Sequence, residues 1–112
     1  MIARHWRGVA HSQDAAAYVE HLRTETFPQL SRIAGFIDAS VLRRIEARGV
    51  EFLVLTHWKS LDAIVAFAGN DPELAVVPER VRFMMIEYDH RARHYEVAVN
   101  TASRTNARRA PG

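Results

Sequence analysis

The stretch at residues 51–67, EFLVLTHWKSLDAIVAF, constrains the fold most, because it combines a strand, a turn and a helix in one short run. Its apolar segment FLVL is rich in strand-forming residues and too short for a helix. Ser60 then suits a helix N-cap, since its hydroxyl can accept a hydrogen bond from a free amide of the first turn. Apolar residues recur at helical spacing as far as Gly69, a residue typical of helix ends. The sequence therefore predicts a buried strand that leads directly into an amphipathic helix.

The rest of the chain divides into elements of the same kind. Three further strands are predicted, at 2–9, 36–46 and 93–99. The segment 47–49 is typical of a hairpin connection that leads into the FLVL strand. Apolar spacings of three and four predict helices at 15–33 and 81–88, with a kink or a break in the first at Pro28 because proline disfavours a helical residue before it.

This order of elements predicts an α+β fold of the ferredoxin-like βαββαβ type with an antiparallel sheet. We expect its first and third strands to lie side by side and parallel at the centre of the sheet. Helices on one side only would leave the other sheet face exposed, yet the FLVL strand is apolar on both faces. A homodimer that buries the open sheet face is therefore expected.

Composition favours one domain at residues 1–100 followed by a basic, disordered tail at 101–112. The tail holds three arginines and no acid, so 12 of the 15 basic residues remain against 13 acidic ones in the body. This balance argues against nucleic-acid binding. Because the chain has no cysteine and no long apolar run, we expect a cytoplasmic protein without membrane contact.

A series of motifs covers residues 1–99: WRG, PQLSRIAGF, VLRR, EFLVLTHWKSLDAIVAFAG and HYEV. In this order they resemble the antibiotic biosynthesis monooxygenase domain. The resemblance implies a dimeric α+β barrel built from two ferredoxin-like subunits. It also implies a choice of activities, because some members oxidise polycyclic phenols or quinols with O₂ and no metal, flavin or other cofactor, and a sister group binds and degrades haem.

The haem-degrading group resembles this chain only in part. That group requires an Asn on the first strand, a second Trp late in the helix after the WKS turn, and a His ligand ten residues further on. This chain has no Asn on its first strand, and it has Phe67 and Val77 at the other two positions. The resemblance therefore disfavours a haem site.

The phenol-oxidising type resembles this chain at Trp58. That type also uses an Asn four residues before the Trp and a Tyr in the following helix, where this chain has Val54 and Ile64. Trp58 is thus the one residue whose role the resemblance carries over.

Cofactor-free oxygenation requires a base, hydrogen-bond donors for a substrate anion, and a dry apolar pocket. His57 and His5 are candidate bases, since neutral histidine accepts protons near pH 7. We expect Trp6 and Trp58 to flank one cavity, because both come late on strands predicted to be parallel neighbours. The candidate substrate-binding residues are Trp6, Trp58, Arg4 on the same face as Trp6, and Tyr95.

Each of these residues also has a structural interpretation. His57 alternates with apolar residues and is expected at a dimer interface as a hydrogen-bonded group, and Trp58 can be packing alone. Tyr18 is predicted in the core, and His21 in solvent. His90 and His94 have a metal-ligand spacing only on a helix, and they fall where a strand begins, so no metal site is predicted.

Two functions remain open from the sequence. The first is a cofactor-independent monooxygenase acting on a small aromatic, phenolic or quinol-type metabolite. The alternative is a non-catalytic dimeric module that binds a small apolar ligand or a protein partner.

Overall fold

The computed structural model describes residues 1–101, so most of the predicted tail at 101–112 lies outside the described residues. The strands are β1 Ile2–Ala10, β2 Phe36–Ile45, β3 Val50–Trp58, β4 Met85–Tyr88 and β5 Arg93–Glu96. The helices are the 3₁₀ turn η1 Ser12–Asp14, α1 Ala15–His21, the π-helix η2 Leu22–Thr26, α2 Phe27–Leu30, α3 Leu61–Ala68 and α4 Glu79–Met84.

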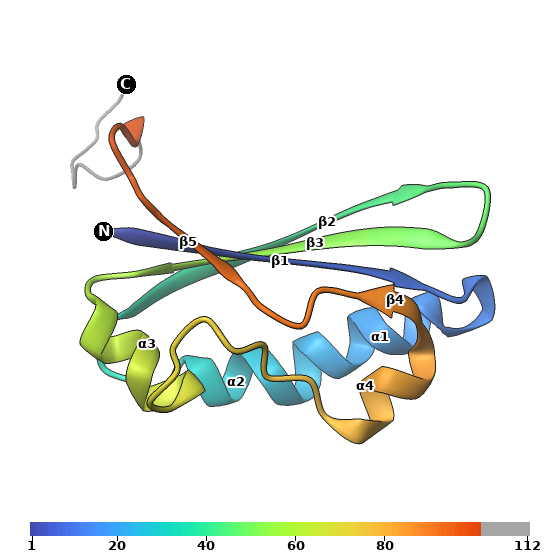
Figure 1. Cartoon of the computed structure of the whole chain (residues 1–112), viewed down its shortest axis with the longest axis horizontal. Helices are drawn as coiled ribbons and strands as arrows, with labels where there is room; N and C mark the ends of the chain where they lie inside the picture. The colour runs from blue at the N-terminus through green and yellow to red at the C-terminus, as the bar shows by residue number, and fades with distance from the viewer. Residues whose placement is uncertain (102–112) are drawn as a thin grey trace.

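These elements form an antiparallel sheet with helices on one side, which confirms the ferredoxin-like α+β fold (Figure 1). The strand order is β2-β3-β1-β4, and β5 also pairs with β1. β4 and β5 share that edge, β4 beside the C-terminal half of β1 and β5 beside its N-terminal half. The other sheet face carries no helix of the described chain.

The predicted parallel pairing of the first and third strands is wrong. β1 and β3 are antiparallel, with Ile2 opposite Trp58 and Trp6 opposite Val54. The helical crossover returns the chain so that β2 runs in the direction of β1, and the β2–β3 hairpin then reverses it. Trp6 and Trp58 consequently lie at different levels of the sheet.

Strand register divides the central side chains between two faces, because successive residues alternate and directly paired residues share a face. The helix face carries Arg4, Trp6 and Gly8 of β1 and Phe52, Val54, Thr56 and Trp58 of β3. The open face carries Ala3, His5 and Arg7 of β1 and Glu51, Leu53, Leu55 and His57 of β3. The core lies on the helix face, where Phe52 and Trp58 are both fully buried.

The strand–turn–helix stretch at residues 51–67 folds as its sequence predicts. The Ser60 hydroxyl accepts a hydrogen bond from the Ala63 amide at 3.3 Å, and Gly69 ends α3 with a positive φ of 89°. Ala63 and Ile64 of this helix are buried beside Trp58. None of the helices within residues 1–101 is long and apolar enough to cross a membrane.

Two predicted helices differ from the structure. The helix expected at 81–88 ends at Met84, and Met85–Tyr88 form β4, because the free edge of β1 offers backbone hydrogen bonds to this segment. The first helix does not break at Pro28, since Phe27 keeps helical angles of −67° and −37°. The wider π-helical turn η2 precedes Pro28, where the proline ring would otherwise crowd a carbonyl one turn earlier.

Candidate functional site

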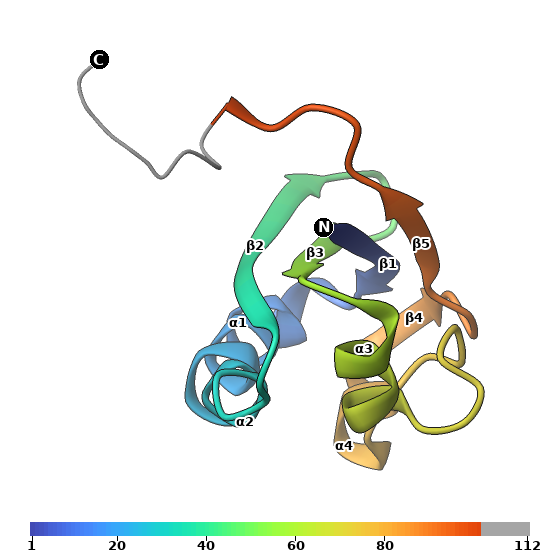
Figure 2. The same cartoon turned by 90° about the vertical axis from the view of Figure 1, so that its left-hand side faces the viewer.

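A small pocket lies against the helix face of β1 and β3, and its lining comes from α1, η2 and α2 and from α3 and residues 76–81. Figure 2 shows α1 and α2 as one group of helices beside the sheet and α3 and α4 as the other. Its volume is about 80 Å³, and it is partly open to solvent. Fifteen residues line it: Arg4, Trp6, Tyr18, His21, Leu22, Thr26, Phe27, Leu30, Val54, Thr56, Phe67, Val76, Val77, Pro78 and Val81. An enclosed apolar cavity of about 150 Å³ accommodates benzene. This pocket has about half that volume, so at most one ring can enter it, and part of that ring would remain in the open mouth.

Trp6 forms one wall and is held in place by its surroundings. Its indole Nε1 donates to the backbone carbonyl of Asp89 at 2.8 Å, so it has no N–H left for a ligand. The ring lies against Gly8, where an added Cβ would come within 2.6 Å of a ring carbon. This close approach explains the glycine of the WRG motif. Trp6 therefore presents an apolar wall to the pocket and no free donor.

Arg4 reaches the same pocket from β1 and is only 5% exposed. Its guanidinium donates to the carbonyls of Pro72 and Leu74, the latter at 3.1 Å, and its Nη1 lies 2.8 Å from His94 Nε2. Its Cζ also lies 5.6 Å from the centre of the Phe67 ring. Burial lowers the pKa of Arg4 to about 10, although the charge of Glu73 acts in the opposite direction, and Arg4 stays charged at neutral pH.

Thr56 faces the pocket from β3, directly opposite Arg4 in the strand register. It is 5% exposed, and its Oγ1 accepts a hydrogen bond from Trp58 Nε1 at 2.8 Å. Trp58 itself is fully buried and does not line the pocket, so the expected cavity flanked by Trp6 and Trp58 is not formed. Trp58 instead contacts the site through Thr56 and through Phe67, whose ring stacks on it at 6.0 Å.

His21 lines the pocket from α1, which contradicts its predicted exposure to solvent. It is 8% exposed, and its Nδ1 is buried without a hydrogen-bond partner among residues 1–101. The nearest carboxylate oxygen, on Glu25, lies 4.0 Å away. Burial lowers the pKa of His21, the charge of Glu25 opposes this and that of Arg80 adds to it, so the net shift is downward and the neutral ring is favoured at pH 7.

Tyr18 is both a core residue and a pocket residue. It is 3% exposed and packs edge-on against Phe52 at 4.9 Å, as its predicted core position requires. Burial raises the pKa of its phenol, so the hydroxyl stays protonated at neutral pH.

The other predicted site residues lie on the open face, away from the pocket. His57 Nδ1 lies 2.7 Å from Asp38 Oδ1, and the pair is partly exposed. His5 is half-buried, and its Nδ1 has no hydrogen-bond partner in the described chain. Tyr95 pairs with Ala3 on the same face and is 51% exposed. The structure thus brings Arg4 and Trp6 together and separates them from His5, His57 and Tyr95.

The sequence contained some signal for the residues it missed. Of the four positions singled out by comparison with the characterised activities, Val54, Phe67 and Val77 line the pocket, and Ile64 is buried in the core with Trp58. Thr56 shares the face of Trp58 through strand alternation. His21 follows Tyr18 by three residues, which places both on one helix face.

The fold and the pocket together define a ferredoxin-like α+β domain with a small apolar site between its sheet and its helices. No family model matches the chain, and neither does any curated protein. Solved structures do match, and they confirm at the level of fold the resemblance to the antibiotic biosynthesis monooxygenase domain.

Three of these structures illustrate the match. A Bacillus cereus protein provisionally assigned as an antibiotic biosynthesis monooxygenase has a TM-score of 0.62 and 24% sequence identity, over 90% of this chain and 96% of its own. A protein from Deinococcus radiodurans with the same assignment has a TM-score of 0.59 and 18% identity, over 89% and 97%. The heme-degrader MhuD from Mycobacterium tuberculosis, with two hemes in its active site, has a TM-score of 0.58 and 19% identity, over 90% and 99%.

The residues of this chain do not fit a haem. Pockets for drug-sized ligands begin near about 300 Å³, whereas this pocket measures about 80 Å³. Phe67 and Val77 occupy the wall where the haem-degrading type requires an indole donor and an imidazole ligand. For a metal ion held by protein side chains alone, which is a separate question from haem, no three His, Cys, Asp or Glu side chains gather within residues 1–101.

Proposed function

We propose that the protein is a cofactor-independent monooxygenase that oxidises a small phenol or quinol in the pocket beneath β1 and β3. The observation that carries this proposal is His21, a buried ring in the lining of a pocket with mostly apolar walls, whose Nδ1 makes no hydrogen bond within residues 1–101. A base of this kind can take the proton of a phenol, and the low polarity of the walls favours electron transfer from the resulting anion to O₂.

The overall reaction balances without a further reductant. A phenol with a free para position reacts with one O₂ to give a para-quinone and one water. One oxygen atom forms the new carbonyl, and the other leaves as water with the two hydrogens that the phenol loses. The substrate supplies all four electrons.

The structure favours different bases from those expected from the sequence. His5 and His57 lie on the open face, so His21 is the imidazole that supports the proposal. Trp6 and Arg4 keep their proposed roles as pocket wall and anion-binding group. Trp58 becomes a positioning residue, since it acts through the Thr56 hydroxyl.

The test is O₂ consumption with a panel of single-ring phenols and hydroquinones. His21→Gln should lose at least about tenfold in rate, since general-base catalysis contributes about 10²–10⁴. His57→Gln is the matched control and should retain the wild-type rate. A wild type that consumes no O₂ above buffer contradicts the proposal, and loss of activity in His57→Gln alone would move the site to the open face.

A non-catalytic ligand-binding module is the second candidate. It is favoured by the apolar residues Val54, Phe67 and Val77 at pocket positions where related chemistries use polar ones. It predicts thermal stabilisation by aromatic ligands without turnover. Ligand at a hundred times its Kd should add about 2.7 kcal/mol to the free energy of unfolding.

A homodimer through the open face forms part of the proposal. Leu53 and Leu55 lie at the centre of that face with no helix of the described chain above them, and Leu42 of β2 beside them is 47% exposed. Burial of these side chains by a second copy would explain an apolar central strand on both faces. Sedimentation at micromolar concentration should give twice the chain mass of 12.7 kDa, and a monomer mass would exclude the dimer.

A further inference from the structure

We propose that the ligand of this pocket is a single-ring aromatic carboxylate, whose carboxylate is bound jointly by Arg4 and Thr56. This inference deepens the proposed function and rests on it for the location of the site. The substrate class becomes a phenol that also bears a carboxylate.

The first observation is a buried cation that makes no ion pair, because the carboxylate of Glu73, which acts on its charge, lies beyond ion-pair distance. Arg4 is 95% removed from solvent, yet no carboxylate of residues 1–101 lies within ion-pair distance of its guanidinium. Its partners are two backbone carbonyls and the Nε2 atom of His94, all of them neutral acceptors. Buried charges are costly in proteins unless they are paired, so an anion is expected to complete this site.

The second observation is that Arg4 has donors left for such an anion. A guanidinium carries five N–H groups in a planar fork. The contacts to Pro72, Leu74 and His94 use three of them, two on Nη1 and one on Nη2. The Nε–H and one Nη2–H remain, and such an edge matches the two oxygens of a carboxylate.

The third observation is the orientation of Thr56, which faces the pocket opposite Arg4 in the register. Its Oγ1 already accepts the indole N–H of Trp58, and no described residue accepts its own O–H. The hydroxyl can therefore donate into the pocket. An acidic ligand has acceptors for both groups, whereas a plain hydrocarbon has none.

The other residues that line the pocket indicate that the ligand carries one aromatic ring. Trp6, Phe27 and Phe67 supply aromatic walls, and the volume of about 80 Å³ restricts the ligand to one ring. The single arginine also favours a monoanion over a phosphate ester, because a phosphate carries nearly twice the charge and needs more donors.

The test compares two ligands of nearly equal shape and different charge. Calorimetric titration of the wild-type protein at pH 7.5 should show benzoate binding at least about thirtyfold tighter than benzamide, because the amide lacks the charge and presents an N–H₂ group to the arginine fork. Equal affinities, tighter benzamide binding or no detectable benzoate binding at millimolar concentration would each overturn the proposal.

Variants then assign the effect to the two residues. Thr56→Val should weaken benzoate binding several-fold and leave benzamide nearly unchanged, while Thr56→Ser, which keeps the hydroxyl, should restore the difference. Arg4→Lys keeps the charge and loses the fork, so most of the preference for benzoate should disappear. Arg23→Met is the control, since this side chain is 69% exposed on the helix surface and should have no effect. Should Arg4→Lys fail to fold, the wild-type comparison and the Thr56 pair still decide.

Benzoate is not a phenol, so its binding is independent of turnover. Preference for benzoate with no O₂ consumption on hydroxybenzoates would contradict the monooxygenase and support the carboxylate site. O₂ consumption on neutral phenols with no preference for benzoate would do the reverse.

Discussion

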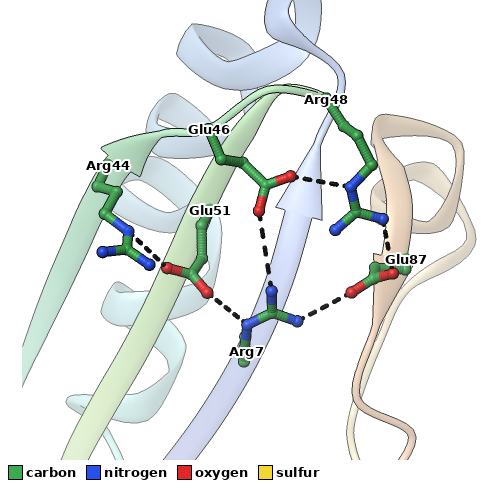
Figure 3. Close-up of polar contacts among 6 residues, drawn as sticks. All are labelled: Arg7, Arg44, Glu46, Arg48, Glu51 and Glu87. Carbon is green, nitrogen blue, oxygen red and sulfur yellow. Dashed lines mark hydrogen bonds and ion pairs between the residues drawn. The ribbon is translucent and has the colours of Figure 1, made fainter.

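Arg4 and Arg7 lie three residues apart on β1 and face opposite sides of the sheet, in two different electrostatic environments. Arg4 is buried beside the pocket, and its hydrogen-bond partners are all neutral. Arg7 is on the open face and is surrounded by carboxylates (Figure 3). Within residues 1–101, the more exposed cation is thus paired directly with carboxylates, whereas the buried one has no carboxylate within ion-pair distance.

The Arg7 network joins three arginines and three glutamates near the β2–β3 hairpin, as Figure 3 shows. Arg7 contacts Glu51 through Nε, Glu87 at 3.0 Å and Glu46 at 4.0 Å. Arg44 pairs with Glu51 at 3.3 Å, and Arg48 bridges Glu46 and Glu87 at 2.9 and 2.8 Å. Hydrogen bonds from Arg48 and Arg7 lower the pKa of Glu87 to about 2.

The comparison indicates that the absence of a direct ion pair at Arg4 is a property of the pocket and not of a chain short of acids. Salt bridges on the open face are screened by water, so they add little energy but keep charges matched. Inside the pocket the same charge interacts much more strongly, because water is largely excluded. An anionic ligand would benefit from this difference, and each of the following changes tests one side of the comparison.

The largest expected effect is the difference in stability loss between a variant on the helix face and one on the open face. Phe52→Ala removes a fully buried ring from the helix face and should lower the free energy of unfolding by about 3–5 kcal/mol. Leu53→Ala, its neighbour on the open face, is half-exposed in the single chain and should cost roughly 1 kcal/mol in a dilute sample.

Urea denaturation at several protein concentrations gives both values. If a second copy covers the open face, the loss of stability caused by Leu53→Ala should grow with protein concentration. The loss caused by Phe52→Ala arises in the core of the single chain, and this contribution stays the same at every concentration. Equal costs for the two variants in dilute solution would show that the faces do not differ in packing.

A smaller effect is expected from Gly8→Ala, which tests how the pocket wall is held. The added methyl would lie 2.6 Å from the Trp6 ring and 3.0 Å from Met85 Sδ, so the indole must shift. Overpacking of this kind costs typically 1–3 kcal/mol, and the moved ring should also weaken benzoate binding. In a Trp6→Phe background the shorter ring should relieve the clash, so a double-mutant cycle in which the two changes are simply additive would contradict this contact.

Much of this architecture could be predicted from the sequence, because local patterns report it. The two-sided apolar strand, the Ser60 cap and the Gly69 helix end all depend on neighbouring residues, and all were predicted. Residues 85–88 were predicted as helix because they continue a helical spacing, and the edge of β1 overrides that spacing with sheet hydrogen bonds. Long-range pairing of this kind leaves no local signal.

The position of the candidate site could be predicted better than the set of residues that form it. Arg4 and Trp6 share a face through simple alternation, so their meeting in one pocket follows from the strand pattern. The error at Trp58 came from the direction of one strand pairing, which moved its ring from the pocket to the core behind Thr56. His21 was missed because its burial depends on the packing of α1 against the segment 76–81, which is distant in the sequence.

The pH dependence of stability tests whether the histidines on the pocket side of the sheet are buried in their neutral form. The pKa of His21 is lowered by burial, and that of His94 by burial and the charge of Arg4. Between these lowered values and the ordinary value of about 6.5, the unfolded chain binds more protons than the folded one, so stability falls as the pH drops through this window.

His21→Gln should therefore reduce, without abolishing, the decrease in Tm between pH 7 and pH 5, because His94 still titrates. Carboxylates with lowered pKa values, such as Glu87, act in a separate window below about pH 4.5. Thermal melts across this range measure the slope, and an unchanged slope in His21→Gln would show that this ring is not buried in its neutral form.

The smallest effect is expected from Arg7→Met, which removes the centre of the open-face network. The side chain is 30% exposed, so solvent screens its pairs and the loss should be about 1 kcal/mol at low salt. In 1 M NaCl, where the screening length is about 3 Å, the difference from wild type should nearly vanish. Arg44→Met, which breaks one pair of a side chain that is 78% exposed, provides the control and should cost less. A loss of stability for Arg7→Met that is large and independent of salt would mean that water is excluded from this face, as it would be beneath a second copy. The contrast between Arg4 and Arg7 would then hold only for the single chain.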